Sequence, residues 1–161
     1  MGYLIDTNVL SEISKGERAN AGVREWFAEA SDEDLFVSAL TFGEIRRGIA
    51  GIRRRDPVSA TYLDQWFTTV QARSAGRVLV VTPGIADRWG RLNIPDPLPV
   101  IDSLLAATAL EHGLTLVSRN IRDVKRTGVS LLNPLLAMNR IGSRYYRKLK
   151  SAQTSNPTAT A

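Results

Sequence analysis

The stretch Tyr3-Leu4-Ile5-Asp6-Thr7-Asn8 changes abruptly from three apolar residues to three polar ones. A short apolar run without alternation predicts a strand that is buried on both faces of a sheet. The polar triplet is typical of a turn into a helix, which we expect to end at Lys15-Gly16. The chain therefore opens with a buried strand, and a carboxylate stands directly after it.

Further along the chain, short apolar runs alternate with segments of helical periodicity. This alternation indicates a parallel sheet covered by helices on both faces, which is an α/β fold. We expect one domain over residues 1–137 and a basic, flexible tail over 138–161, where the composition cannot support a packed core. Further strands are predicted at 35–37, 78–81, 115–118 and 129–132, and helices at 20–30, 38–51, 58–72, 84–92 and 100–111.

The composition excludes several chemistries. Among 161 residues there is no cysteine and one histidine, so thiol catalysis, disulfides, iron–sulfur clusters and multi-histidine metal sites are ruled out. A bound metal would need oxygen ligands, which suit Mg²⁺ or Mn²⁺. Because there is neither a long apolar segment nor a signal peptide, we expect a cytoplasmic protein without a membrane span.

Positive charge is unevenly distributed. The chain carries 21 Lys and Arg against 16 Asp and Glu, and every acidic residue lies before residue 124. A second basic cluster lies within residues 46–55, which include five arginines. Such patches attract phosphate backbones or acidic protein surfaces, although solvated helix faces are an equally good interpretation of single residues.

Acidic residues stand where ligands collect in a parallel sheet, beyond the carboxyl ends of the strands. Four carboxylates from four segments are predicted to converge on one cleft, with Asn120 nearby. Each has a structural alternative: helix capping for Asp6 and Asp102, an ion pair with Arg47 for Glu44, and a turn for Asp123. The four candidates are Asp6, Glu44, Asp102 and Asp123.

A cluster of like charges is expected to persist only when a cation compensates it. Mg²⁺ or Mn²⁺ would do so, and would lower the pKa of a bound water and stabilise charge on a phosphate. This chemistry is that of phosphodiester hydrolysis.

Four segments, 4–12, 37–45, 101–109 and 118–124, together resemble the signature segments of PIN-domain ribonucleases. The resemblance is to the VapC-type toxins of type II toxin–antitoxin systems, including the plasmid stability proteins, and it covers residues 2–135. It implies a three-layer fold with a central parallel sheet of four to five strands. It also implies a metal-dependent endoribonuclease that acts on tRNA or rRNA.

The resemblance assigns roles to individual positions. Asp6 and Asp102 would be direct ligands of Mg²⁺ or Mn²⁺, and Glu44 would help to hold the metal, its waters and the attacking water. Asn8 matches a position that hydrogen-bonds neighbouring acids. Relatives carry the fourth acid either at the position of Asn120 or three residues later, where this chain has Asp123.

The resemblance also implies protein partners. We expect a homodimer and an antitoxin, which assemble into a heterotetramer or a larger complex. The helices with Arg46–Arg55 and Tyr62–Val70 would form the dimer and antitoxin face, and would give Trp66 and Phe67 a buried role there. Ordinary core packing is the alternative for both aromatic residues.

Two other functions are compatible with parts of the sequence. A structure-specific DNA nuclease of the flap-endonuclease kind would share the fold and metal, but it would need insertions for which this chain has no room. A non-catalytic nucleic-acid or protein interaction module is the second alternative. Nucleotide binding has no support, because neither G-x-G-x-x-G after the first strand nor G-x-x-x-x-G-K-[ST] occurs.

Overall fold

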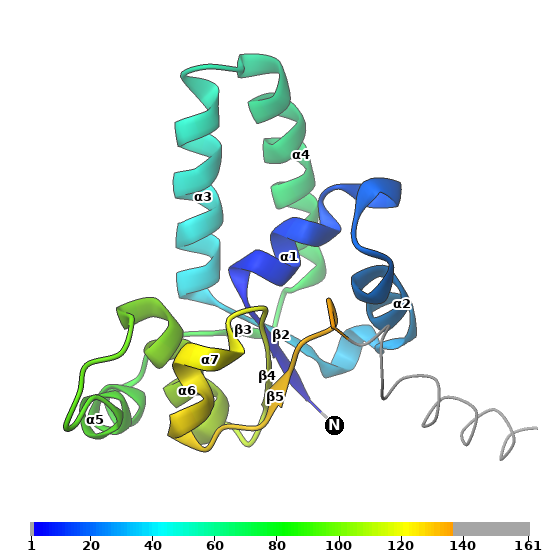
Figure 1. Ribbon diagram of the computed structural model, residues 1–161. Coiled ribbons are helices and arrows are strands. Elements are labelled where there is room, and N and C mark those ends of the chain that lie inside the picture. Colours follow the sequence, from blue (N-terminus) through cyan, green and yellow to red (C-terminus); the bar gives the residue numbers. More distant parts are fainter. Residues whose placement is uncertain (1, 137–161) are drawn as a thin grey trace, which may run out of the picture.

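A computed structural model describes residues 2–136 of the chain (Figure 1). The predicted tail over 138–161 lies outside the described residues. Three short 3₁₀ helices, Gly16–Arg18, Asp32–Asp34 and Lys125–Thr127, lie in the connections. The strands are β1 (Tyr3–Ile5), β2 (Leu35–Ser38), β3 (Val78–Leu79), β4 (Thr115–Val117) and β5 (Leu131–Leu132). The α-helices are α1 (Thr7–Ile13), α2 (Ala21–Glu29), α3 (Ala39–Arg53), α4 (Pro57–Arg73), α5 (Pro83–Leu92), α6 (Val100–Glu111) and α7 (Ile121–Val124).

The five strands form one parallel sheet in the order β3-β2-β1-β4-β5. The first strand is central, and Ile5 lies opposite both Val37 of β2 and Val117 of β4. Because every strand runs in the same direction, the segments that follow β1, β2 and β4 all leave from one edge of the sheet. The predicted α/β fold with a parallel sheet is confirmed.

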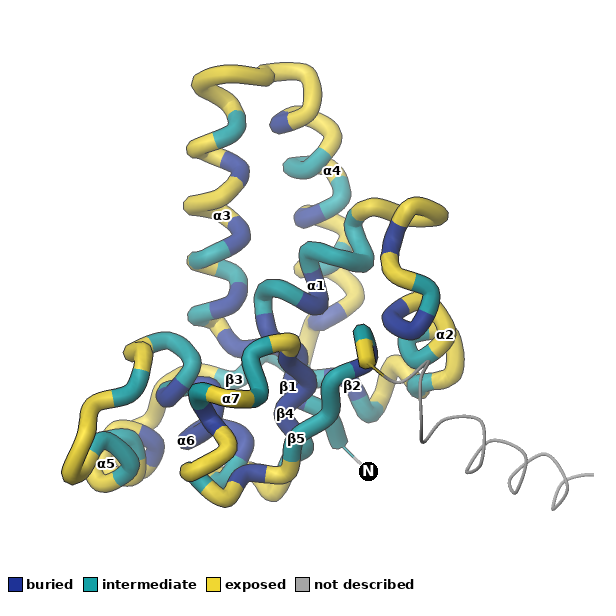
Figure 2. The backbone as a smooth tube through the Cα atoms, viewed as in Figure 1, coloured by how far each residue is buried: buried dark blue, intermediate teal, exposed yellow. Residues whose placement is uncertain are grey.

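Two separate cores lie on the two faces of the sheet, because neighbouring residues of a strand point to opposite sides. Ile5, Val37 and Val117 belong to a core that they share with α1, α2, α3 and α4. Leu4 and Leu116 belong to the other core, which they share with α6 and α7. Helix α5 packs on the outside of α6. The molecule therefore has three layers, with the sheet in the middle (Figure 2).

Helices α3 and α4 form an antiparallel pair that rises away from the sheet (Figure 1). Their buried residues face one another and their outer sides are exposed (Figure 2). Phe67 is 2% exposed and makes an edge-on ring contact with Phe42, with centroids 5.4 Å apart. For Phe67 the alternative of ordinary core packing holds, because its ring fills the interior of the pair, whereas Trp66 is half-buried against the same core.

Several element boundaries differ from those expected from the sequence. The third strand ends at Leu79 instead of residue 81, and Val80 and Val81 are exposed. Its neighbour β2 pairs only as far as Ser38 and then turns into α3, so the two valines have no strand beside them. The fifth strand begins two residues later than expected, and β5 pairs with β4 at Leu131 and Leu132.

Within the described part of the chain, none of the helices combines the length and the apolar character that crossing a bilayer requires.

Candidate active site

The candidate site lies at the carboxyl edge of the sheet, where three adjacent strands end in polar residues. Asp6 follows the aligned triplet of β1, Ser38 ends β2, and Ser118 follows β4. The backbone N–H of Asp6 donates to the carbonyl of Val117, and the carbonyl of Asp6 accepts from Leu10, so the residue is fixed between strand and helix. Ser38 serves the fold, since its Oγ accepts from the N–H of Leu40 and caps α3.

Asp6 is almost fully buried, with 3% of its surface exposed. It occupies the position before α1, but its side chain makes no capping hydrogen bond. Instead, its Oδ2 accepts from Ser118 Oγ at 2.6 Å and from Asn8 Nδ2 at 2.6 Å. The Asp6 carboxylate therefore does not act as a simple helix cap.

Asp102 lies in the first turn of α6, where Pro99 and not Asp102 occupies the cap position. Its Oδ2 accepts a hydrogen bond of 2.7 Å from Asn120 Nδ2. Asn120 in turn donates its backbone N–H to Ser118 Oγ at 2.9 Å. The hydroxyl of Ser118 thus links the two carboxylates that the sequence analysis assigned to the metal.

Glu44 approaches from the second turn of α3. Its Oε2 accepts from Thr7 Oγ1 at 2.6 Å, which joins α3 to the first residue of α1. The expected ion pair with Arg47 is loose, at 3.7 Å between Arg47 Nη2 and Glu44 Oε1, and the Arg47 side chain is 83% exposed. Glu44 is therefore held by the short hydrogen bond from Thr7, and its contact with the exposed Arg47 is weak.

Asp123 lies in α7, a single turn that immediately follows Asn120, and is half-buried. In relatives the fourth acid stands at the position of Asn120 or at that of Asp123. In this chain the Asn120 side chain donates a hydrogen bond to Asp102, while the charge of Asp123 raises the pKa of Asp102.

The pKa values of the two central carboxyl groups are both raised. Burial is the main cause for Asp6, and the charge of Glu44 adds to it, while hydrogen bonds from Ser118, the Thr7 backbone and Asn8 oppose the rise in pKa. For Asp102 burial again raises the pKa most, followed by the charge of Asp6, and the charges of Asp123 and Glu44 add to the shift against the hydrogen bond from Asn120. The charges of Asp6, Asp123 and Glu44 thus all raise the pKa of Asp102, which indicates that the four acids influence one another.

Two residues of this arrangement were missed by sequence reasoning, namely Thr7 and Ser118. A signal for Ser118 was present, since it is the first polar residue after an apolar strand, as Asp6 is. Parallel strands end at one edge, so these two positions are adjacent once β1 and β4 are recognised as neighbours. Thr7 carried no comparable signal, because its partner Glu44 lies 37 residues away.

The donor set suits a hard divalent cation. Within residues 2–136, the side chains that hydrogen-bond to Asp6 and Asp102 are a hydroxyl and neutral amides. Over the same residues, Arg47 is the one cationic side chain paired with any of the four acids, and it contacts Glu44 from the solvent side. Within residues 2–136, no three acidic or histidine side chains are arranged closely enough to hold a metal together. Two direct carboxylates with water in the remaining positions is, however, how Mg²⁺ is commonly bound.

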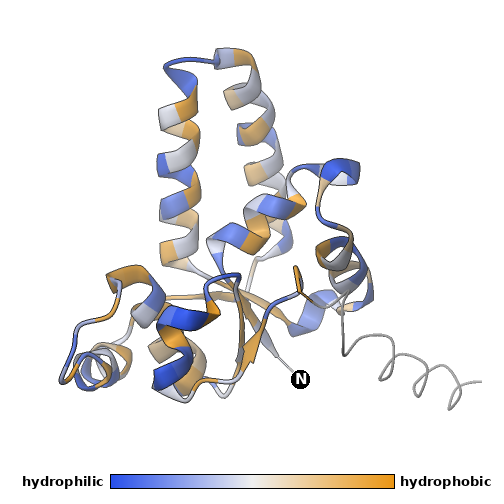
Figure 3. Cartoon of the chain, in the orientation of Figure 1, coloured by the Kyte–Doolittle hydropathy of each residue, from blue (hydrophilic) through white to orange (hydrophobic). Residues whose placement is uncertain are grey.

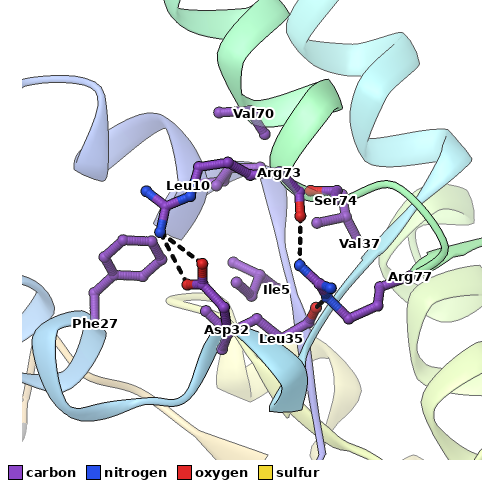
Figure 4. A pocket seen from close by; sticks show the side chains of 10 residues that line it. All are labelled: Ile5, Leu10, Phe27, Asp32, Leu35, Val37, Val70, Arg73, Ser74 and Arg77. Carbon is purple, nitrogen blue, oxygen red and sulfur yellow. Dashed lines mark hydrogen bonds and ion pairs between the residues drawn. The ribbon is translucent and has the colours of Figure 1, made fainter.

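A separate small cavity lies on the α2 and α4 side of the sheet, beneath Phe27 and Val70 (Figure 4). Two of the lining residues form an ion pair, in which Arg73 Nη2 donates to Asp32 Oδ2 at 2.8 Å and to Asp32 Oδ1 at 3.0 Å. Arg77 Nε donates to the carbonyl of Leu35 at 3.1 Å. None of the four candidate acids lines this cavity, and its polar groups already bond to one another.

The fold and the site together define a three-layer α/β domain whose acidic residues gather at the carboxyl ends of a five-stranded parallel sheet. Within that class, residues 3–129 match the PIN domain family, and the chain belongs to this family. The resemblance drawn from four sequence segments is thereby confirmed.

Curated relatives point the same way. The chain is 30% identical over 139 residues to the VapC ribonuclease Y4jK of Sinorhizobium fredii, and 27% identical over 135 residues to the plasmid stability protein StbB of Pseudomonas syringae pv. tomato. Each alignment covers 81% of this chain and 96% of the relative. Toxin FitB of Neisseria gonorrhoeae is 28% identical over 138 residues, with the same coverage.

Solved structures share the fold. The structure of FitAB bound to an IR36 DNA fragment matches with a TM-score of 0.75 and 26% identity, over 83% of this chain and 95% of that one. FitAcB from Neisseria gonorrhoeae matches with a TM-score of 0.70 and 25% identity, over 83% and 99% of the two chains.

Proposed function

We propose that this chain is a Mg²⁺- or Mn²⁺-dependent endoribonuclease that acts as the toxin of a toxin–antitoxin pair, with tRNA or rRNA as its target. The observation that carries the proposal is the hydrogen-bonded link from Asp6 through Ser118 and Asn120 to Asp102, with the charges of Glu44 and Asp123 acting on it. Relatives named ribonuclease and toxin over 81% of the chain support the reaction class.

In this proposal each residue has a defined task. Asp6 and Asp102 would hold the cation, which when bound lowers the pKa of a water and neutralises charge on the phosphate. Ser118 and Asn8 hold one oxygen of Asp6 in place, and Asn120 does the same for Asp102. Glu44, positioned by Thr7, is placed to orient the attacking water and accept its proton, while Asp123 adds negative potential that favours a cation.

A protein partner is part of the proposal, because the similar solved structures are those of FitAB bound to a DNA fragment and of FitAcB. The outer side of α4 offers a suitable apolar surface, since Val58 is 82% exposed and Tyr62 is 61% exposed one turn later. We expect this stripe, together with the half-buried Trp66, to contact the antitoxin or a second copy of the chain. Exposed apolar side chains spaced four residues apart are typical of helix-mediated docking.

The decisive experiment is cleavage of total bacterial RNA by the purified protein with Mg²⁺, Mn²⁺ or EDTA, and sequencing of the new ends. We expect discrete cuts that require the metal and are lost in Asp6→Ala and in Asp102→Asn. Asp87→Asn is the matched control, because Asp87 is an exposed acid of α5 that pairs with Arg91 and is none of the four candidate acids. Cleavage that persists in EDTA, or that survives both active-site substitutions, would contradict the proposal, and a folded, antitoxin-free protein that never cuts would favour an interaction module.

A further inference from the structure

The basic cluster within residues 46–55 divides into two groups with different surroundings. Arg46 and Arg53 both pair with the carboxylate of Asp64 on α4, and the Arg46 guanidinium lies 4.8 Å from the centre of the Phe67 ring. These two arginines therefore join α3 to α4. Their charge is already partnered within the helical pair.

The other three arginines have no such structural task. In the described part of the chain, Arg54 and Arg55 have no carboxylate within ion-pair distance, and Arg47 has the loose 3.7 Å contact with Glu44. Arg54 and Arg55 lie in the turn between α3 and α4, a region that is strongly hydrophilic in Figure 3, whereas Arg47 lies in the middle of α3. The turn contributes one acid, Asp56, whose Oδ1 accepts from the N–H of Ser59 and so caps α4.

Arg47 lies on α3 three residues after Glu44, and Arg54 and Arg55 directly follow the last residue of that helix, with Arg54 still in a helical backbone conformation. Residues at spacings of three, ten and eleven from Glu44 return to the same helix face, because 3.6 residues complete each turn. Gly48 and Gly51 lie between the arginines, and a Cβ at either position would meet nothing within 4 Å. We call this surface the arginine stripe: it has arginines at both ends and glycines, which carry no side chain, between them. It consists of Arg47, Gly48, Gly51, Arg54 and Arg55, and it begins three residues after Glu44 of the candidate active site.

The chemistry of this face favours a polyanion. None of the large hydrophobic side chains exposed between residues 2 and 136 comes from α3, whereas α4 exposes Val58 and Tyr62. A protein-docking face would present such side chains, so the two helices offer different surfaces. Unpaired arginines with glycines between them instead suit a phosphate backbone, which binds through charge and needs close approach.

We propose that the arginine stripe binds the phosphate backbone of the RNA substrate and leads it toward the cleft. The inference rests on the proposed ribonuclease function and deepens it. At about 1.5 Å per residue, Arg54 lies ~15 Å along the helix from Glu44. The stripe therefore contacts nucleotides several positions away from the bond that is cut, and contributes affinity without reading the sequence.

The test is RNA binding by Arg54→Ala/Arg55→Ala in the Asp102→Asn background, where cleavage does not interfere. The probe is a single-stranded homopolymeric RNA long enough to reach from the cleft to the tip of the helical pair, titrated between 50 and 300 mM salt. Removing two phosphate contacts should weaken binding about tenfold and reduce the slope of log K against log salt by about 1.4, since each single-strand contact contributes roughly 0.7. Arg54→Lys/Arg55→Lys should restore most of both quantities.

The matched control is Arg88→Ala/Arg91→Ala, which removes the same charge from α5, where both arginines are engaged in ion pairs. Equal weakening by both double variants would overturn the inference, because it would show a general charge effect. Unchanged RNA binding together with altered self-association or antitoxin binding would also overturn it and assign the stripe to a protein partner. Failure of the wild type to cut RNA would count against the proposed function, while the binding titration would still report on the stripe.

Discussion

At the scale of single residues, the hydroxyl of Ser118 has a central position in the candidate site. It donates to one carboxylate and accepts from the backbone N–H of Asn120, whose side chain holds the other carboxylate. A hydroxyl can do both at once, which an amide N–H or a carboxylate cannot. The orientation of Asp6 relative to Asp102 therefore depends on a residue that is not itself a metal ligand.

This dependence predicts that Ser118→Ala lowers RNA cleavage about 10- to 100-fold, the usual cost of losing a group that orients a metal ligand. Ser118→Thr, which keeps the hydroxyl, should recover most of the activity. The measurement is the dependence of the cleavage rate on Mn²⁺ concentration, in which the Ala variant should need more metal for half-maximal rate. Ser14→Ala, which removes a hydroxyl bonded only to the Ser11 carbonyl, serves as the control. An Ala variant with unchanged metal dependence would mean that Ser118 has no positioning role.

A second residue-scale prediction concerns the cost of gathering like charges. Because the pKa of Asp102 is raised in the folded protein, the folded state binds this proton more tightly than the unfolded state does. Its contribution to stability is thus most favourable below the ordinary carboxyl pKa and declines as the pH rises through the raised pKa. Above the raised pKa the metal-free protein carries the full penalty.

Asp102→Asn should therefore stabilise the metal-free protein at pH 7, by about 1 kcal/mol or a Tm increase of roughly 2–4 °C. The advantage should shrink as the pH is lowered, because the wild-type carboxyl then becomes neutral as well. Thermal denaturation at pH 7 and pH 4, with and without Mg²⁺, measures this, and added Mg²⁺ should raise the Tm of the wild type but not that of the variant. A variant less stable than the wild type at pH 7 would show that the charges are already compensated within the protein.

The acids of the site and the contact of Asn8 with a neighbouring acid were predicted from the sequence, whereas the contacts made by Thr7, Ser118 and Asn120 were not. Asp6, Asp102 and Asp123 each follow or begin a recognisable element, so their position at the sheet edge follows from the α/β pattern. The contacts of Thr7 with Glu44 and of Asn120 with Asp102 join segments 37 and 18 residues apart. Such pairings depend on the angle at which helices leave the sheet, which no local pattern encodes.

At the scale of elements, the sequence predicted helices more reliably than strand lengths. The helices from Ala39 and from Pro57 carry their own caps, Ser38 and Asp56, and their own apolar periodicity. No local sequence signal marks the end of the strand Val78–Leu79, since two further valines follow it. The strand ends where its neighbour stops pairing with it. Strand boundaries are set by partners, and helix boundaries largely by local residues.

The α3–α4 pair yields an element-scale prediction. Gly48 and Gly51 lie within α3 and have open space where a side chain would begin, so internal packing does not require glycine at either position. Alanine is better than glycine inside a helix by roughly 0.5–1 kcal/mol per site. Gly48→Ala/Gly51→Ala should therefore raise the free energy of unfolding by about 1–2 kcal/mol, measured by urea denaturation. A loss of stability would indicate a close contact at these positions that the monomer does not contain.

At the scale of the whole molecule, the described part forms a closed unit in which both faces of the sheet are covered. Its cores include residues from β1 through Leu131 and Leu132, which precede the basic segment in the sequence. Residues 1–137 contain 16 basic and 16 acidic residues, whereas 138–161 contain five basic residues and no acidic one. The formal net charge of +5 therefore resides entirely in the segment after residue 137.

We predict that a chain ending at residue 137 folds with a Tm within about 2 °C of the full protein and retains metal-dependent cleavage of a short RNA. Its affinity for long RNA at low salt should fall, because up to five phosphate contacts are removed, and the slope of log K against log salt should decrease by up to about 3.5. Binding titrations on both lengths of chain measure this, and Arg88→Ala/Arg91→Ala in the full chain controls for charge lost elsewhere. A truncated chain that unfolds, or that fails on the short RNA, would place the last 24 residues within the domain instead of beside it.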